Sequence, residues 1–431
     1  MISNKTPNRL IAPDVDNQHK IALIEPEKIV LKNGTQLFLF PDNSREAMRM
    51  DMVFDAGSAF QDKKLAASTT IGMLREGTTK FTAGTLNMRI DYHGAYLDLQ
   101  STKDHGYLTL YCLGKSLPAL LPLVQDMLTQ AVFKERNFNI YNRRQKQEFQ
   151  LSSQKAKHLA NRLYTANLYG AESVYGQIAD EADFAALTTS DLKTFYGKHF
   201  QPARTKIILS GPVTQKTIHH IISSFGDIEN TLSPTDFVQD TLFQPKLLFK
   251  KKPGALQSAI MMGKPVMLRT HKDYFGFLVL NTILGGYFGS RLMTNIREDK
   301  GYTYGIHSMV SPMRKASGFT IATEVGTDVT KAALAEIRLE LLRLIENPVK
   351  DEELWLVKNY LNGTYLRSLD GVYSQADKFR ITLDLDGRMD YYARSLDAIN
   401  AIGATELKDL AERYLNPDEM LTVVVGDKEV E

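Results

Sequence analysis

Residues 284–306 read LGGYFGSRLMTNIREDKGYTYGI, and they join the elements that decide the fold. Glycine commonly ends a helix, so the pair Gly285-Gly286 predicts the end of a helix that begins near residue 274. Apolar periodicity predicts further elements after this pair. They are a helix over about 289–299, strands over 303–310 and 318–325, a long helix over about 327–345, and another helix from 351.

The first half of the chain predicts the same order of elements roughly 210 residues earlier, which is typical of an internal repeat. Residues 29–40 predict a β-hairpin that turns at Asn33-Gly34. The elements that follow are a strand at 50–54, helices over about 63–75 and 85–93, strands over 96–101 and 107–113, and helices over about 117–130 and from 135. We therefore expect an α+β fold built by tandem duplication, in which helices cover antiparallel sheets.

Turn-forming residues and mixed polarity mark a seam between the two repeats at 227–254. The expected organisation is an N-terminal arm over 1–25, a first domain over 26–230 and a second domain over 231–431. The longest basic cluster, Lys250-Lys251-Lys252, falls within this seam, and we assign it to a linker.

Composition excludes several classes of protein. Lys and Arg total 52 against 50 Asp and Glu, for a net charge of +2, which argues against nucleic-acid and membrane-surface partners. No apolar run approaches the roughly 20 residues that span a bilayer. The single cysteine, Cys112, excludes an intramolecular disulfide and a cysteine-built zinc site. The first ten residues lack the apolar core of a signal peptide, so we expect a cytoplasmic protein and leave the periplasm open.

Three segments of this duplicated chain resemble the pitrilysin/insulinase family of zinc peptidases. Residues 53–58 and 73–78 resemble the segments that flank the family's H-x-x-E-H helix, and residues 284–306 resemble its second-domain signature. In active members the two histidines bind Zn²⁺, the glutamate activates the metal-bound water, and a later glutamate completes the coordination. The resemblance therefore implies that these flanks should enclose a zinc motif.

The motif itself is absent from this sequence. Its first position falls on Ser68, its base position on Ile71 and its last position on Gly72, so neither histidine nor the base is present. The third-ligand position falls on Glu148, for which a solvated helix glutamate is the simpler interpretation. We therefore predict no metal site in this chain.

The second-domain signature implies a different role. By position, the arginine and tyrosine with which family members reach across the chamber are Arg297 and Tyr304. A guanidinium and a phenol can both donate hydrogen bonds to a substrate carbonyl and to a developing oxyanion. The structural alternatives are an ion pair of Arg297 with Glu298 or Asp299, and core packing of Tyr304 on a strand.

The glycine-rich loop of residues 285–289 resembles that of non-catalytic subunits, such as the alpha subunit of mitochondrial processing peptidase, where it helps to hold substrate. Its predicted substrate-binding residues are Gly285, Gly286, Tyr287, Phe288 and Gly289. Simple capping of a helix by Gly285 or Gly286 is an equal alternative.

The resemblance as a whole implies a zinc-free subunit, similar to the Arg/Tyr-bearing subunit of bacterial two-subunit peptidases. We expect this chain to be inactive alone, to carry no cofactor and to bind peptide. Its partner would be a zinc-bearing homologous subunit, in a heterodimer, or a second copy of itself. An inert peptide-binding or structural homodimer is the main alternative, and a stand-alone zinc peptidase is the weakest one because the ligands are absent.

Overall fold

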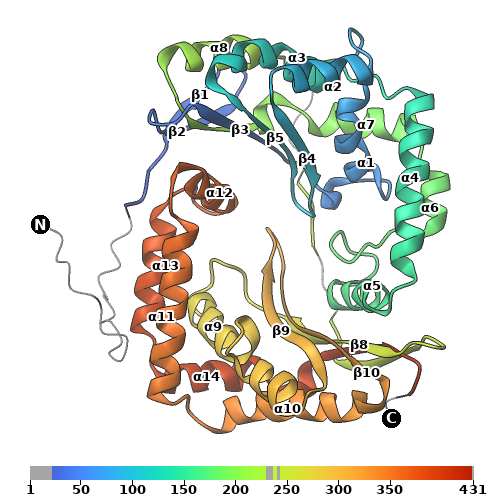
Figure 1. The fold of residues 1–431 in the computed structure, drawn as a ribbon, viewed down its shortest axis with the longest axis vertical. Coiled ribbons are helices and arrows are strands. Elements are labelled where there is room, and N and C mark those ends of the chain that lie inside the picture. The colour runs from blue at the N-terminus through green and yellow to red at the C-terminus, as the bar shows by residue number, and fades with distance from the viewer. Residues whose placement is uncertain (1–21, 230–235, 240–242, 430–431) are drawn as a thin grey trace, which may run out of the picture.

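Two β-sheets, one in each half of the chain, face each other across the molecule (Figure 1). The computed structural model describes residues 22–229, 236–239 and 243–429, so most of the expected N-terminal arm lies outside the described residues. The first sheet contains β1 (Glu27–Val30), β2 (Gln36–Pro41), β3 (Ala47–Phe54), β4 (Tyr96–Ser101), β5 (Gly106–Leu113) and β6 (Lys206–Gly211). The second contains β7 (Lys246–Lys251), β8 (Gln257–Pro265), β9 (Thr303–Pro312), β10 (Ser317–Gly326) and β11 (Leu421–Gly426).

The two sheets share one topology. Their strand orders are β1-β2-β6-β3-β5-β4 and β7-β11-β8-β10-β9, so the second repeats the first without an equivalent of β1. In each sheet one pair is parallel, β2 with β6 and β7 with β11, and the other pairs are antiparallel. This repeated order confirms the predicted α+β fold built by duplication.

Helices cover the outer faces of both sheets and connect their strands (Figure 1). Those of the first half are α1 (Ala66–Met73), α2 (Ala83–Tyr92), α3 (Leu117–Thr129), α4 (Glu135–Ser153), α5 (Ala156–Tyr169), α6 (Glu181–Ala186), α7 (Thr189–His199) and α8 (Gln215–Phe225). Those of the second half are α9 (Tyr274–Asn281), α10 (Thr330–Glu346), α11 (Asp351–Ser368), α12 (Val372–Thr382), α13 (Asp390–Ala401) and α14 (Ala404–Tyr414). The predicted helices are present with ends shifted by a few residues, and the one predicted over about 289–299 is the π-helical segment Met293–Asp299.

The basic cluster at the seam is not a linker, which corrects the assignment made from sequence. Lys250 and Lys251 belong to β7, and Lys252 follows it directly. β7 pairs in parallel with β11, from Lys246 opposite Leu421 to Lys251 opposite Gly426. As an edge strand β7 keeps its lysines in solvent, and lysine on an edge strand also discourages pairing with other chains.

The two halves exchange one helix each. α5 comes from the first half but packs on β8 and β11, whereas α12 comes from the second half and packs on β6 and β2 (Figure 1). Gly263 permits the first approach, because a Cβ there would lie 1.9 Å from the carbonyl oxygen of Phe319 and 2.4 Å from the hydroxyl of Tyr164. The other contact buries aromatic residues of β2 against α12, with the rings of Phe38 and Phe379 4.8 Å apart. Each sheet is therefore completed by the other half of the chain.

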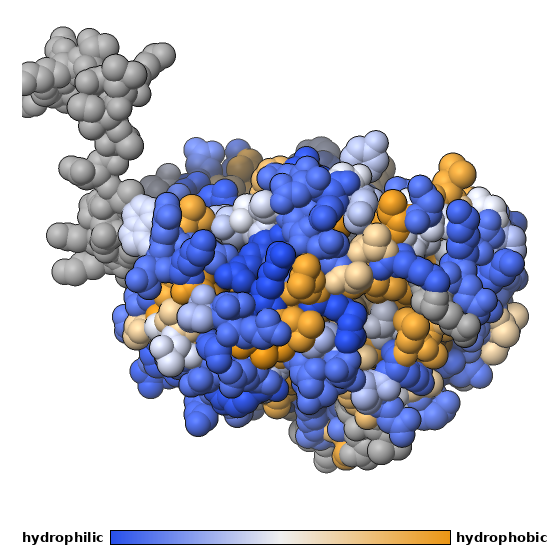
Figure 2. All heavy atoms as spheres, turned by 90° about the horizontal axis from the view of Figure 1, so that it is seen from below, coloured by the Kyte–Doolittle hydropathy of each residue, from blue (hydrophilic) through white to orange (hydrophobic). Residues whose placement is uncertain are grey.

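The helices α10 and α14 lie beneath the second sheet at the lower end of the molecule (Figure 1). Figure 2 shows the molecule from this side, where hydrophilic residues predominate and hydrophobic side chains are scattered among them. None of the helices in the described part of the chain is long and apolar enough to cross a membrane.

Candidate functional site

Helix α1 holds the positions at which the family carries its zinc motif, and the core of the first half occupies them. Ser68 points to solvent and donates to the carbonyl of Leu65 at 3.3 Å. Ile71 is 1% exposed, and its terminal methyl lies 3.0 Å from the place where a Cβ on Gly106 would stand. These two motif positions therefore hold an exposed serine and a buried isoleucine, and neither side chain can act as the general base.

The last motif position is filled by a neighbouring helix. A Cβ on Gly72 would lie 2.1 Å from the hydroxyl of Tyr141 on α4 and 2.8 Å from the carbon that bears it. Burial raises the pKa of the Tyr141 phenol, which keeps it neutral. An imidazole at position 72 would therefore require Tyr141 to move away.

Glu148 lies on α4, seven residues beyond Tyr141, which is about 10 Å along a helix. Its side chain is 61% exposed, accepts a hydrogen bond from Gln145 at 3.3 Å and lies 4.0 Å from the Arg144 guanidinium. Across the described ranges, no three His, Cys, Asp or Glu side chains come together closely enough to hold a metal ion. The carboxylate at the third-ligand position thus has only local polar partners.

The glycine-rich loop of the second half is shaped by close contacts. Residues Thr282–Gly286 form a π-helical turn after α9, a geometry often found at functional sites. Gly285 is buried, and a Cβ there would lie 2.7 Å from the backbone nitrogen of Ser308, so the turn can rest directly on β9. Tyr287 packs against Tyr360 of α11 with ring centroids 4.8 Å apart, while Phe288 remains 63% exposed.

Arg297 and Tyr304 meet beside this loop. The Nε of Arg297 donates to the carbonyl oxygen of Tyr304 at 3.1 Å, and the guanidinium lies 4.6 Å from the centre of the Phe288 ring. The predicted helix-end ion pair is also present, with Glu298 3.7 Å from Arg297. Tyr304 is 94% exposed, so the alternative of core packing is wrong for this residue. The arrangement presents a phenol and a cation together at the surface.

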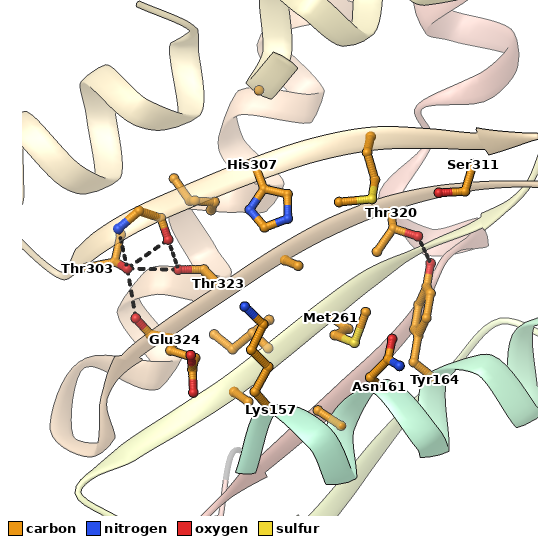
Figure 3. A pocket seen from close by; sticks show the side chains of 18 of the residues that line it. Lys157, Asn161, Tyr164, Met261, Thr303, His307, Ser311, Thr320, Thr323 and Glu324 are labelled. Carbon is orange, nitrogen blue, oxygen red and sulfur yellow. Dashed lines mark hydrogen bonds between the residues drawn. The ribbon is translucent and has the colours of Figure 1, made fainter. Parts of the chain in front are cut away.

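A long cavity extends from this cluster between α5 and the second sheet, and we name it the apolar groove (Figure 3). Its volume is about 810 Å³. Figure 3 shows Lys157 and Tyr164 of α5 on one side, Met261 of β8 at the base, and His307 of β9 on the other side. Apolar side chains dominate its lining, among them Ile260, Met261, Met293, Ile306, Met309 and Met313. Such a groove suits an apolar ligand of peptide size.

Charged groups are few in the apolar groove. Burial lowers the pKa of His307, and the nearby charge of Lys157 lowers it further, so the imidazole is neutral at physiological pH. Thr303 donates to the backbone carbonyl of Glu324 at 2.7 Å, which fixes the end of β9 that carries Tyr304. The glycine loop and Tyr304 line the same end of this groove.

Sequence patterns did not reveal a buried charge cluster where α12 meets the first sheet. The Nε2 of His105 lies 2.9 and 2.7 Å from the two carboxylate oxygens of Asp384, and its Nδ1 lies 3.5 Å from Asp55. Burial alone would lower the pKa of His105, but these two carboxylates raise it to about 9, so the imidazole is charged. His105 and Asp384 lie 279 residues apart in the sequence. A contact between residues so far apart cannot be recognised from the pattern of a single sequence.

Comparison with known proteins agrees with the resemblance found in the sequence. Residues 186–361 match the family model described as "Peptidase M16 inactive domain". The matched residues make up less than half of the chain, and over them the chain is similar to the M16 peptidase family. The word inactive in that description agrees with the absence of the H-x-x-E-H motif from residues 68–72.

Similar proteins match this chain over nearly its whole length. It is 20% identical to "Uncharacterized zinc protease YmxG" of Bacillus subtilis, covering 92% of this chain and 98% of that protein. It is also 20% identical to "Non-peptidase homolog YmxG" of Helicobacter pylori, covering 96% and 93%. The crystal structure of a peptidase M16 inactive domain from Pseudomonas fluorescens superposes with a TM-score of 0.85 at 20% identity, covering 94% of this chain and 99% of that one. These similarities support the family and the fold.

Proposed function

We propose that this chain is the zinc-free subunit of a two-subunit M16 metallopeptidase and pairs with a zinc-bearing homologue. The observation that carries the proposal is the exposed pair Arg297 and Tyr304 at the mouth of a peptide-sized apolar groove. Ser68 and Gly72 replace the two zinc-binding histidines, and Tyr141 fills the space beside Gly72, so the chemistry of bond cleavage has to come from elsewhere.

The chain would contribute binding and electrostatic stabilisation. A peptide would lie in the apolar groove, with its scissile carbonyl near the glycine loop. The Tyr304 phenol is free to donate to the carbonyl oxygen and to the oxyanion that develops on it. Arg297 uses Nε to hold the Tyr304 backbone, which leaves its terminal N–H groups to face the same oxygen. Zinc in the partner subunit would activate the attacking water.

The exposure of both groups fits a role in trans. A phenol that is 94% exposed contributes little to the fold of its own chain, so it is free to contact a partner subunit. The cation–π contact of Arg297 with Phe288 orders the cluster before a partner arrives. Such preorganisation lowers the entropic cost of assembling the shared site.

The second candidate function is a catalytically inert peptide-binding or structural homodimer. It is favoured by the filled motif helix, and the H. pylori relative carries the name of a non-peptidase homologue. The same apolar groove would then hold peptide without cleavage.

The test is reconstitution with a zinc-motif homologue from the same genome. Each chain alone and the equimolar mixture would be assayed on a quenched fluorescent peptide library, with association measured by analytical ultracentrifugation. We expect a 1:1 complex and activity only in the mixture. A partner that cuts equally well alone would refute the shared site, and self-association with peptide binding but no activity would establish the homodimer.

A further inference from the structure

The apolar groove leads into a second cavity between the two halves of the chain, and we name it the ionic pocket. It has a volume of about 590 Å³ and lies between the β4–β5 turn, the β9–β10 turn and α12. Lys103 and Met313 line both cavities, so the two spaces adjoin at these residues. A ligand that lies along β9 in the apolar groove would therefore reach the ionic pocket at Pro312.

Cations outnumber carboxylates in the ionic pocket. Its lining contains Lys103, Arg269, Arg314, Lys378 and Arg380 together with Asp104, Asp377 and Asp384, and the protonated His105. Two of the arginines have carboxylate partners, since Arg314 lies 3.3 Å from Asp55 and Arg380 lies 3.4 Å from Asp51. The other three cations, Lys103, Arg269 and Lys378, are the candidates for binding an anion.

Lys103, Arg269 and Lys378 form no ion pair within the described residues. The ammonium of Lys103 donates only to the backbone carbonyl of Gln177, at 3.2 Å. Burial lowers the pKa of Lys103, and burial together with the nearby charge of Arg269 lowers the pKa of Lys378. Asp104 acts on Lys103 and Asp377 acts on Lys378 in the opposite sense, but burial outweighs both carboxylates, and a bound anion would offset this cost.

We propose that the ionic pocket binds an acidic side chain of a peptide whose apolar segment lies in the apolar groove. The inference rests on the proposed function and adds to it the class of substrate. A carboxylate matches the fork of Arg269, and Lys378, which feels the charge of Arg269, can donate to the same carboxylate. A single negative charge also suits a wall that contains three aspartates better than a phosphate dianion would.

The length of β9 sets the length of this peptide. From Tyr304 to Pro312 there are eight steps of about 3.3 Å, or roughly 26 Å in extended form. An extended peptide of about ten residues would therefore span both cavities. One end would lie beside the Arg297–Tyr304 cluster and the other in the ionic pocket.

The experiment is a binding measurement on the full chain alone, which does not depend on cleavage. Two fluorescein-labelled decapeptides would share one apolar sequence and blocked termini, and would differ only by Glu or Gln at one end, with each end tested. We expect the Glu peptide at one end to bind about tenfold more tightly than its Gln counterpart, the effect of one charge-assisted hydrogen bond. Raising the salt concentration would reduce this preference.

The preference should disappear in the double variant Arg269→Gln/Lys378→Met, whereas the Gln peptide should bind it as tightly as the unaltered chain. That second value shows that the variant is folded and that the apolar groove is intact. The matched control is Arg143→Gln/Lys193→Met, which removes two exposed cations of α4 and α7 and should keep the preference. Equal affinity for the Glu and Gln peptides in the unaltered chain would refute the acidic subsite and leave the peptide groove standing. If neither peptide binds, peptide binding itself fails, and the proposed function fails with it.

Discussion

α5 and α12 occupy equivalent places in the two halves, yet they contact their sheets with different chemistry. α5 begins at Ala156 and α12 at Val372, so their positions correspond at an offset of 216 residues. On the second sheet, Tyr164 of α5 donates to the carbonyl of Phe319 at 2.9 Å beside an open apolar groove. The position on α12 that corresponds to Tyr164 holds Arg380, which pairs with Asp51 on the first sheet.

Further ion pairs connect the region of α12 to the first sheet. Asp384, at the position that corresponds to Leu168 of α5, binds the buried His105, and Arg49 adds an ion pair with Asp377. Such buried pairs fix the geometry between packed elements more than they add net stability. Combined with the filled motif helix, they make the first half a support, whereas the second half keeps an open groove and exposed polar groups. One topology thus holds ion-paired packing in one copy and an open apolar groove in the other.

The largest effect is expected from restoring a base in the first half. Ile71→Glu places a carboxylate in a position that is 1% exposed, among the apolar side chains of the first-half core. Raising the pKa of a buried glutamate above 7 costs about 4 kcal/mol of folding stability. Urea unfolding would measure it, with Ile71→Val as the control at roughly 1 kcal/mol.

Extending this variant to the complete motif tests the comparison itself. In Ser68→His/Ile71→Glu/Gly72→His, the Tyr141 hydroxyl stands where the new side chain at 72 would begin. We expect no zinc in the purified protein. A folded triple variant with one tightly bound zinc would show that the first half retains the capacity for a metal site.

A smaller effect on folding stability is expected from removing the ion pair between His105 and Asp384. His105 has its pKa raised to about 9 in the folded chain against an ordinary value near 6.5, so its stabilising effect is complete below pH 6.5 and disappears as the pH rises through 9. The shift corresponds to roughly 3 kcal/mol. His105→Gln should remove this pH dependence, which unfolding curves at pH 6 and pH 9.5 would measure.

The carboxylates of this cluster give the opposite dependence. The pKa values of Asp55 and Asp384 are lowered, because hydrogen bonds to His105 outweigh burial, so their contribution is present at neutral pH and is lost in acid. Identical pH profiles for the unaltered chain and His105→Gln between pH 6 and 9.5 would contradict the role given to this pair.

The next largest loss of folding stability is expected where α5 closely approaches the second sheet. Gly263→Ala forces a methyl group against the Phe319 carbonyl and the Tyr164 hydroxyl, so we expect a loss of about 2 kcal/mol and a displaced helix. The matched control is Gly363→Ala in α11, where a Cβ meets nothing within 4 Å. That change should stabilise the chain by up to about 1 kcal/mol, because alanine favours helix. Equal stabilities in thermal unfolding would show that α5 is loosely seated.

Sequence patterns predicted the parts of this structure that depend on local order. Periodicity and glycines predicted the repeat, and the signature singled out Arg297 and Tyr304, whereas the contact of Arg297 with Phe288 comes from the structure alone. The exchange of α5 and α12 and the pairing of His105 with Asp384 depend on contacts between distant segments, which a single sequence does not encode visibly. β7 escaped prediction because its lysines mask a strand that forms through pairing with β11.

The smallest effect is expected from the phenol of Tyr304 on folding. Because this side chain is 94% exposed, Tyr304→Phe should change the free energy of unfolding by less than about 0.5 kcal/mol. Tyr92→Phe, at an 85% exposed position of the first half, is the matched control. A larger loss in urea unfolding would mean that the hydroxyl serves the fold, and it would weaken the contrast between a supporting half and a binding half.

The most direct test of the shared site is the activity of the mixture with these same substitutions. Arg297→Ala and Tyr304→Phe would each be combined with the zinc-bearing homologue, alongside the controls Arg143→Ala and Tyr92→Phe. We predict that kcat/KM for a peptide falls roughly ten- to a thousandfold in the first two mixtures, with complex formation unchanged, and stays unaltered in the controls. Full activity with both Arg297→Ala and Tyr304→Phe would contradict the account.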